Sequence, residues 1–292
     1  GREVEASLGT EDFGVGVTGG SFGLLYRDGA LAFEAIGGLY LNGGGFASAV
    51  ASEVFVGYNE AGVDLSEESL GVGELSYSFQ NLPAVSDYLA VSVSGLEASL
   101  AGALYVRGDF GFSVNGGTDE VVAVAQNVEA GLSAGGFEAG IVNGSLGLLI
   151  DGNGALVLEA RGTPSLNLGG PIELGAETVS LRVNETGTAY TGESLEAGQL
   201  SYTFENLPAS DSLLELALDN AYLKLAGFVE VSGNFAVRAD SDTVTLGDGS
   251  TVSVEVLTVG ASEVSAFAGY NGGSAQALGL ELSEVNFALG LF

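Results

Sequence analysis

Four residue types are missing from this chain of 292 residues: histidine, cysteine, methionine and tryptophan. Without histidine, the chain lacks the commonest general base and the commonest transition-metal ligand of proteins. Without cysteine, it can form no disulfide, thiolate nucleophile or soft-metal site. No P-loop is present either. We therefore expect that the chain is not an enzyme, and we assign it no catalytic or cofactor-binding residues.

Basic residues are scarce, at seven against 38 acidic ones, and Lys224 is the single lysine. The resulting formal net charge of −31 excludes nucleic acid as a natural partner, because a phosphate backbone would repel this surface. Self-repulsion of this size keeps a surface hydrated and resists clumping. Such a surface is favoured in high salt, in the presence of divalent cations or in an extracellular matrix.

Long apolar runs are also absent, since no stretch approaches the roughly 18 apolar residues of a membrane helix. We therefore expect no transmembrane helix. The segment Gly1–Thr10 lacks the basic and then apolar layout of a signal peptide, so an export signal would lie outside this segment. Proline is rare, at four residues, whereas glycine reaches 48. Abundant glycine without proline is typical of many tight turns between short strands.

Internal repetition is the strongest pattern that the sequence does contain. Leu75–Ala84 reads LSYSFQNLPA, and Leu200–Ala209, 125 residues later, reads LSYTFENLPA. Gly29–Ala35 matches Gly154–Ala160 at the same offset. Self-similarity at a fixed period indicates a tandem array. We predict one repeat unit at 1–126, a second at 127–260 and the start of a truncated third at 261–292. The aromatic residues shared by the two motifs are interpreted as core.

Apolar residues alternate with polar ones with a period of two, which is typical of β-strands that have one buried face. The alternation runs from Leu96 to Val114 without a break. Asp-Gly pairs between such runs, as at Asp28–Gly29, are typical hairpin turns. Thr243–Leu257 is the clearest hairpin candidate. We predict an all-β, tandem-repeat fold with an elongated β-solenoid-like or stacked-sheet architecture; tandem β-sandwich domains are the alternative.

Acidic turns supply the only candidate metal ligands. Asp151 with Asn153, and Asp240 with Asp242, place oxygen atoms at alternating positions, as hard cations such as Ca²⁺ require. The motifs are shorter than a complete calcium loop, and turn geometry alone also explains them. We therefore retain these four residues as calcium candidates.

The stretches VSGNFAVRA, TVTLGDGSTVSVEVLTVGASEVSAFAGYNGG and ALGLELSEVNFALGL resemble repeats of very large, acidic, glycine-rich bacterial proteins. Those proteins are considered exported and surface-associated, and they often carry calcium-binding or adhesin modules. The resemblance covers most of the chain and brings no catalytic residue with it. It implies an extracellular or cell-surface protein that forms arrays.

Three functions follow from these observations. The first is a structural segment of an extracellular fibre, stalk or matrix, whose partners are neighbouring copies of the same repeat and which assembles into filaments. The second is an adhesin module that binds surface glycans with calcium. The third and weakest alternative is an outer-membrane β-barrel.

Overall fold

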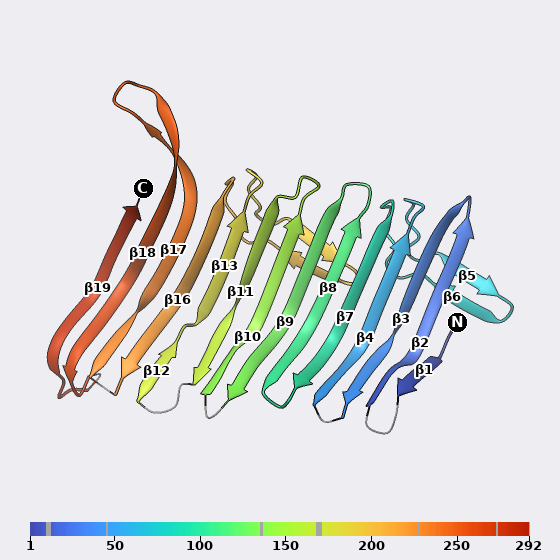
Figure 1. The fold of residues 1–292 in the computed structure, drawn as a ribbon, viewed down its shortest axis with the longest axis horizontal. Helices are drawn as coiled ribbons and strands as arrows, with labels where there is room; N and C mark the ends of the chain where they lie inside the picture. The colour runs from blue at the N-terminus through green and yellow to red at the C-terminus, as the bar shows by residue number, and fades with distance from the viewer. Residues whose placement is uncertain are drawn as a thin grey trace. The chain divides into compact units, whose positions relative to one another are not determined.

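The computed structural model describes residues 1–9, 13–44, 46–134, 137–167, 171–226, 228–272 and 274–291. The expected all-β fold is confirmed, and these residues contain no helix. Accordingly, no described segment is a helix long and apolar enough to cross a membrane. Among the described residues, 15 strands belong to one open antiparallel sheet, and four more form two separate hairpins (Figure 1).

The chain divides into two compact units. Unit 1 comprises Gly1–Gly131, Ser145–Ala155 and Glu193–Phe204. Its sheet strands pair in the order β1 (Val4–Gly9), β2 (Phe13–Arg27), β3 (Ala30–Gly43), β4 (Ala47–Asn59), β7 (Tyr88–Leu100) and β8 (Leu104–Asn115). The unit also holds both hairpins, which are β5 (Ser69–Val72) with β6 (Leu75–Ser78), and β14 (Ser194–Ala197) with β15 (Leu200–Thr203).

Unit 2 comprises Leu132–Gly144, Leu156–Gly192 and Glu205–Phe292. Its strands pair in the order β11 (Leu156–Asn167), β13 (Thr178–Asn184), β16 (Leu213–Leu225), β17 (Val229–Thr245), β18 (Thr251–Tyr270) and β19 (Leu278–Leu291). The short strand β12 (Ile172–Gly175) pairs with the end of β16. Strands β9 (Glu120–Ala134) and β10 (Phe137–Ile150) contribute residues to both units.

The turn between β2 and β3 follows the predicted chemistry. Asp28 and Gly29 both have positive φ, at 55° and 89°, and they connect the paired residues Arg27 and Ala30. Two consecutive positive φ angles are the geometry that Asp-Gly hairpin turns provide. The hairpin predicted at Thr243–Leu257 is confirmed as the junction of β17 and β18.

The long alternating run from Leu96 to Val114 is a hairpin rather than a single strand. Leu100 pairs with Leu104 across the turn, so the alternation continues from β7 into β8. The register slips by one residue between Val93 and Leu96, where Gly95 adopts a φ of 60°. This bulge keeps Leu96, Ala98 and Leu100 on the same face of the sheet as Leu89, Val91 and Val93.

The bulge recurs 125 residues later. In β7, the backbone N–H of Gly95 donates a 2.8 Å hydrogen bond to the Asp109 carboxylate. In β16, Asn220 has a φ of 48°, and its N–H donates a 2.8 Å hydrogen bond to the Asn234 side chain. At each bulge, the neighbouring strand therefore supplies a side-chain acceptor for an N–H group that has no partner in the strand ladder.

The hydrophobic core lies between the sheet and the hairpins. Tyr77, Phe79 and Leu82 pack on Ala32 of β3, with Leu65 beside them. The rings of Tyr77 and Phe79 meet edge to face at a centroid distance of 5.7 Å, and those of Tyr202 and Phe204 do so at 5.6 Å. All four rings are buried, in agreement with the core interpretation of the repeated motif.

The compact units do not follow the repeat boundaries predicted at residues 126 and 260. The hairpin Glu193–Phe204 belongs to the second repeat by sequence, but it packs within unit 1. The repeat itself is visible as matched elements, since β7 at Tyr88–Leu100 and β16 at Leu213–Leu225 are 125 residues apart.

Candidate functional site

A buried carboxylate fixes the first hairpin to the sheet. Glu34 of β3 has no exposed surface. It accepts a hydrogen bond from the Tyr77 hydroxyl at 2.7 Å and bonds from the backbone N–H groups of Gln80 and Asn81 at 2.9–3.0 Å. Charge-assisted hydrogen bonds of this kind are among the strongest in proteins. Burial, followed by the bond to Glu34, raises the pKa of Tyr77.

We call this buried glutamate, with the hydrogen bonds that it accepts, the latch. The second repeat contains an equivalent latch, in which Glu159 lies 125 residues after Glu34 and is 4% exposed. Its carboxylate accepts a 2.9 Å hydrogen bond from the backbone N–H of Glu205, the counterpart of Gln80. Glu205 adds a negative charge where the first repeat has Gln80. Arg161 neutralises this charge, because it forms ion pairs with both Glu159, at 3.3 Å, and Glu205. The latch is thus retained although its surroundings change.

A buried asparagine closes each long loop. The side-chain amide of Asn59 donates hydrogen bonds of 2.8 Å to the carbonyl oxygens 4 and 24 residues later. Asn184 donates to the carbonyl oxygens at the same two separations, at 2.7 Å each. Both asparagine residues are fully buried. Each therefore holds together the two ends of a loop that carries a hairpin.

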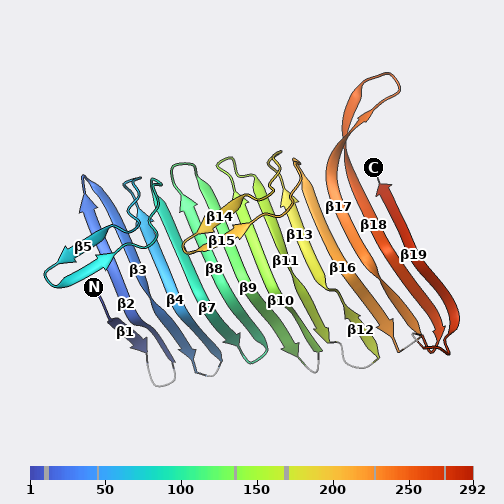
Figure 2. The ribbon, with the colours of Figure 1, turned by 180° about the vertical axis from the view of Figure 1, so that it is seen from behind.

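The β14–β15 hairpin of the second repeat docks on strands of the first repeat. Figure 2 shows it lying across β8, on the same face of unit 1 as β5–β6, and it contacts β7 as well. Hydrogen bonds at its tip include those from Ser113 to the carbonyl of Glu196 at 3.0 Å, from the N–H of Gln199 to Ser92 at 3.4 Å, and from Asn81 to the carbonyl of Gly198.

Close approach of this hairpin depends on Gly111 in β8. A Cβ atom at Gly111 would lie 2.5 Å from the carbonyl oxygen of Ala197. The residue Ala197 is fully buried. Neither this glycine nor the serines at 92 and 113 carried a signal in the sequence, because their partners lie more than 80 residues away along the chain.

The Asp151 candidate forms part of a turn. One of its carboxylate oxygens accepts 2.9 Å hydrogen bonds from the N–H groups of Asn153 and Ala155. The hydrogen bond from Ala155 is the largest influence on this carboxyl, and the pKa of Asp151 is lowered. The structure therefore gives the Asp151 carboxylate a turn-stabilising role, and its role as a calcium ligand stays a prediction.

The Asp240 candidate is engaged by protein groups. Its carboxylate accepts hydrogen bonds from the Ser210 hydroxyl at 2.5 Å and from Arg238. Burial is the largest single influence and would raise the pKa of Asp240, but the bonds from Arg238, Ser210 and the N–H of Ser241, with the charge of Arg238, together lower it. Asp242 accepts a hydrogen bond from the N–H of Thr243. No group of three or more acidic side chains suited to a metal ion occurs among the described residues.

The face of unit 1 opposite the hairpins is apolar and uncovered. Cross-strand neighbours on β2, β3, β4, β7 and β8 form continuous apolar rows, which include Leu24–Phe33–Tyr58–Leu89–Val114 and Phe22–Ala35–Val56–Val91–Phe112. Leu24 is 57% exposed, and Phe22 and Phe112 are each 42% exposed. The sequence pattern correctly placed these apolar side chains on one face, but the prediction that this face is buried is wrong, because the hairpins cover the opposite face.

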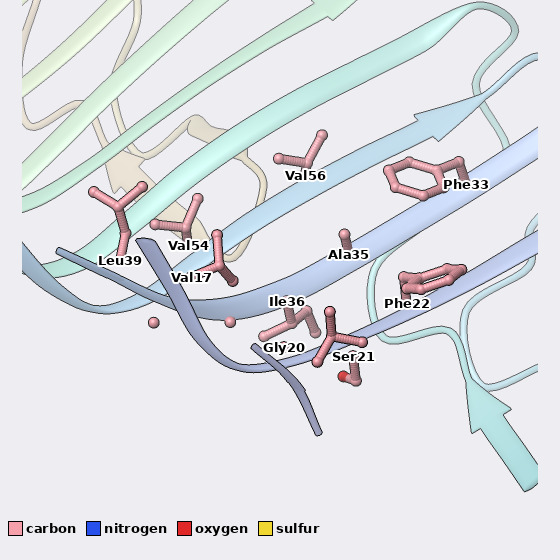
Figure 3. A pocket seen from close by; sticks show the side chains of 13 residues that line it. Val17, Gly20, Ser21, Phe22, Phe33, Ala35, Ile36, Leu39, Val54 and Val56 are labelled. Atoms are coloured by element: carbon pink, nitrogen blue, oxygen red, sulfur yellow. The ribbon is translucent and has the colours of Figure 1, made fainter. Parts of the chain in front are cut away.

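A shallow hollow interrupts this apolar face (Figure 3). Its lining comes from β1 to β4 and consists of apolar side chains, glycines and one serine. Its lining includes Gly20 and Gly37, together with the side chains of Val17, Val54 and Phe22. The hollow can therefore hold an apolar group, but its lining offers no acid or base for catalysis.

Unit 2 repeats the arrangement on its own strands. Its apolar rows are Leu158–Val183–Leu214–Ala239–Leu257–Leu291 and Ala160–Leu181–Leu216–Val237–Val259–Leu289. The opposite face carries the alternating charges Glu159, Arg182, Glu215 and Arg238 on neighbouring strands. Arg182 forms an ion pair with Glu215. Each unit therefore has one face with continuous apolar rows and an opposite face that carries charged side chains.

Comparison with known proteins identifies no relative: no family model, no curated protein and no solved structure matches the chain.

Proposed function

We propose that this chain is a structural repeat segment of an extracellular or cell-surface array, in which successive repeats are held in series by their hairpins. The observation that supports this most is the docking of the β14–β15 hairpin on β7 and β8. Its sequence belongs to the second repeat, whereas Ser92, Gly111 and Ser113 belong to the first. Each repeat is then stabilised by its neighbour, as in other repeat architectures.

The recurrence of the latch favours the same function. Glu34 with Glu159 and Asn59 with Asn184 retain their bonding roles over a 125-residue period. Conservation of backbone-holding groups between repeats is what an array needs for a constant geometry from one unit to the next. The net charge of −31 suits a hydrated extracellular setting.

Electron microscopy of the purified chain tests this function. Negatively stained samples would be compared in about 5 mM calcium, a concentration that fills weak extracellular sites, and in chelator. Rods or regular fibres support the structural function, and their loss in chelator would support calcium binding at the acidic turns. Compact, separate particles in both conditions would contradict assembly. Glycan-binding screens of the adhesin alternative would then be the next measurement.

A further inference from the structure

The uncovered face of unit 1 is too large to stay in contact with water. Five strands about 4.8 Å apart, each about 12 residues long at about 3.4 Å per residue, cover roughly 1,000 Å². Soluble monomers rarely expose apolar patches above a few hundred Å². A stable protein interface buries about 800 Å² on each partner. The face of unit 1 alone therefore has the area of a complete interface.

No charged side chain interrupts the rows of this face. A further row is Val15–Leu41–Ala49–Ala98–Val106. Between it and the row Phe22–Phe112, the paired positions carry Gly37, Val54, Val93 and Phe110, and then Val17 and Leu39. The charged residues of the same strands, such as Glu97 and Asp109, occupy the alternate positions, on the side of the hairpins. A partner must therefore also present an uncharged apolar surface.

We propose that a second copy of this chain covers the face, with the two sheets stacked apolar side to apolar side. Stacked sheets pack about 10 Å apart with their inner side chains interdigitated. An isologous pair of this kind brings two uncharged faces together and directs both sets of carboxylates outward, so the like charges of the two chains stay apart. The glycine-lined hollow receives a projecting side chain of the partner.

A lipid surface fits the same face less well. An open sheet leaves unpaired backbone groups along its edges, and these are costly in contact with hydrocarbon. The net charge of −31 would also be repelled by anionic headgroups. Pairing through this face is independent of the end-to-end repeat docking described above, so each can fail without the other.

Two matched substitutions on β8 test the proposal. Phe112, which is 42% exposed, lies on the apolar face, and Tyr105, which is 39% exposed, lies on the opposite face. We expect sedimentation velocity of the native chain to give twice the 29.3 kDa of one chain or a higher multiple. Phe112→Glu should shift the protein to the single-chain mass, whereas Tyr105→Glu should leave the native mass unchanged.

A second measurement covers the case in which a glutamate variant fails to fold. Because the chain has no cysteine, Phe112→Cys and Tyr105→Cys each introduce a single thiol. A short bismaleimide should link two chains through position 112 and leave position 105 unlinked. A native chain of single-chain mass at micromolar concentration overturns the proposal, as do equal linking at both positions and capture of a monomer by neutral lipid vesicles.

Discussion

Glu34 is a charged side chain without exposed surface, and its burial depends on the hydrogen bonds that it accepts from three donors, the Tyr77 hydroxyl and the N–H groups of Gln80 and Asn81. We expect Glu34→Gln to lower the free energy of unfolding by roughly 2–4 kcal/mol, because its amide nitrogen cannot accept the N–H bonds and each buried donor left alone costs about 1–3 kcal/mol. Urea denaturation measures the loss. Glu97→Gln, an exposed change on β7, should stay within about 0.5 kcal/mol of the native protein. Equal effects of the two substitutions would contradict the latch.

The raised pKa of Tyr77 makes the same latch sensitive to alkali. The folded chain holds this phenol proton more tightly than the unfolded chain does, so its contribution to stability is complete below about pH 10. It is lost as the pH rises above that value, because the unfolded chain then releases the proton first. We expect the urea midpoint of the native protein to fall more steeply above about pH 10 than that of Tyr77→Phe. Parallel profiles for the two proteins would show that another tyrosine dominates.

At the scale of elements, the docking of β14–β15 depends on the absence of a side chain at Gly111. Gly111→Ala should destabilise the protein by about 1–3 kcal/mol, the usual cost of overpacking. It should also speed hydrogen exchange in Ser194–Thr203. Gly71→Ala is the matched control, because Gly71 also lies in a strand and a Cβ atom there would meet nothing within 4 Å. If exchange in the hairpin were unchanged in Gly111→Ala, the hairpin would not be held by β8.

The strands and turns could be predicted from the sequence because they depend on the local pattern of apolar, polar and turn residues. The hairpin at Thr243–Leu257 and the core role of Tyr77 and Phe79 follow from alternation and recurrence. Local pattern cannot give the partner of a long-range contact. Glu34 belongs to a repeated segment, but nothing in that segment shows that its carboxylate bonds to backbone more than 40 residues away. For the same reason, alternation marked an apolar face and could not show which face the hairpins cover.

The whole molecule carries a net charge of −31, so salt should stabilise it. Raising NaCl from about 0.01 M to 1 M shortens the Debye length from about 30 Å to 3 Å and weakens this repulsion. A gain of about 2 kcal/mol would raise the melting temperature by roughly 4–8 °C, which scanning calorimetry can measure. If screening alone acts, then calcium, magnesium and sodium chlorides at equal ionic strength should give the same increase. A larger increase with calcium that Asp151→Asn or Asp240→Asn removes would instead identify that aspartate as a calcium ligand, and sodium chloride should reproduce none of the excess.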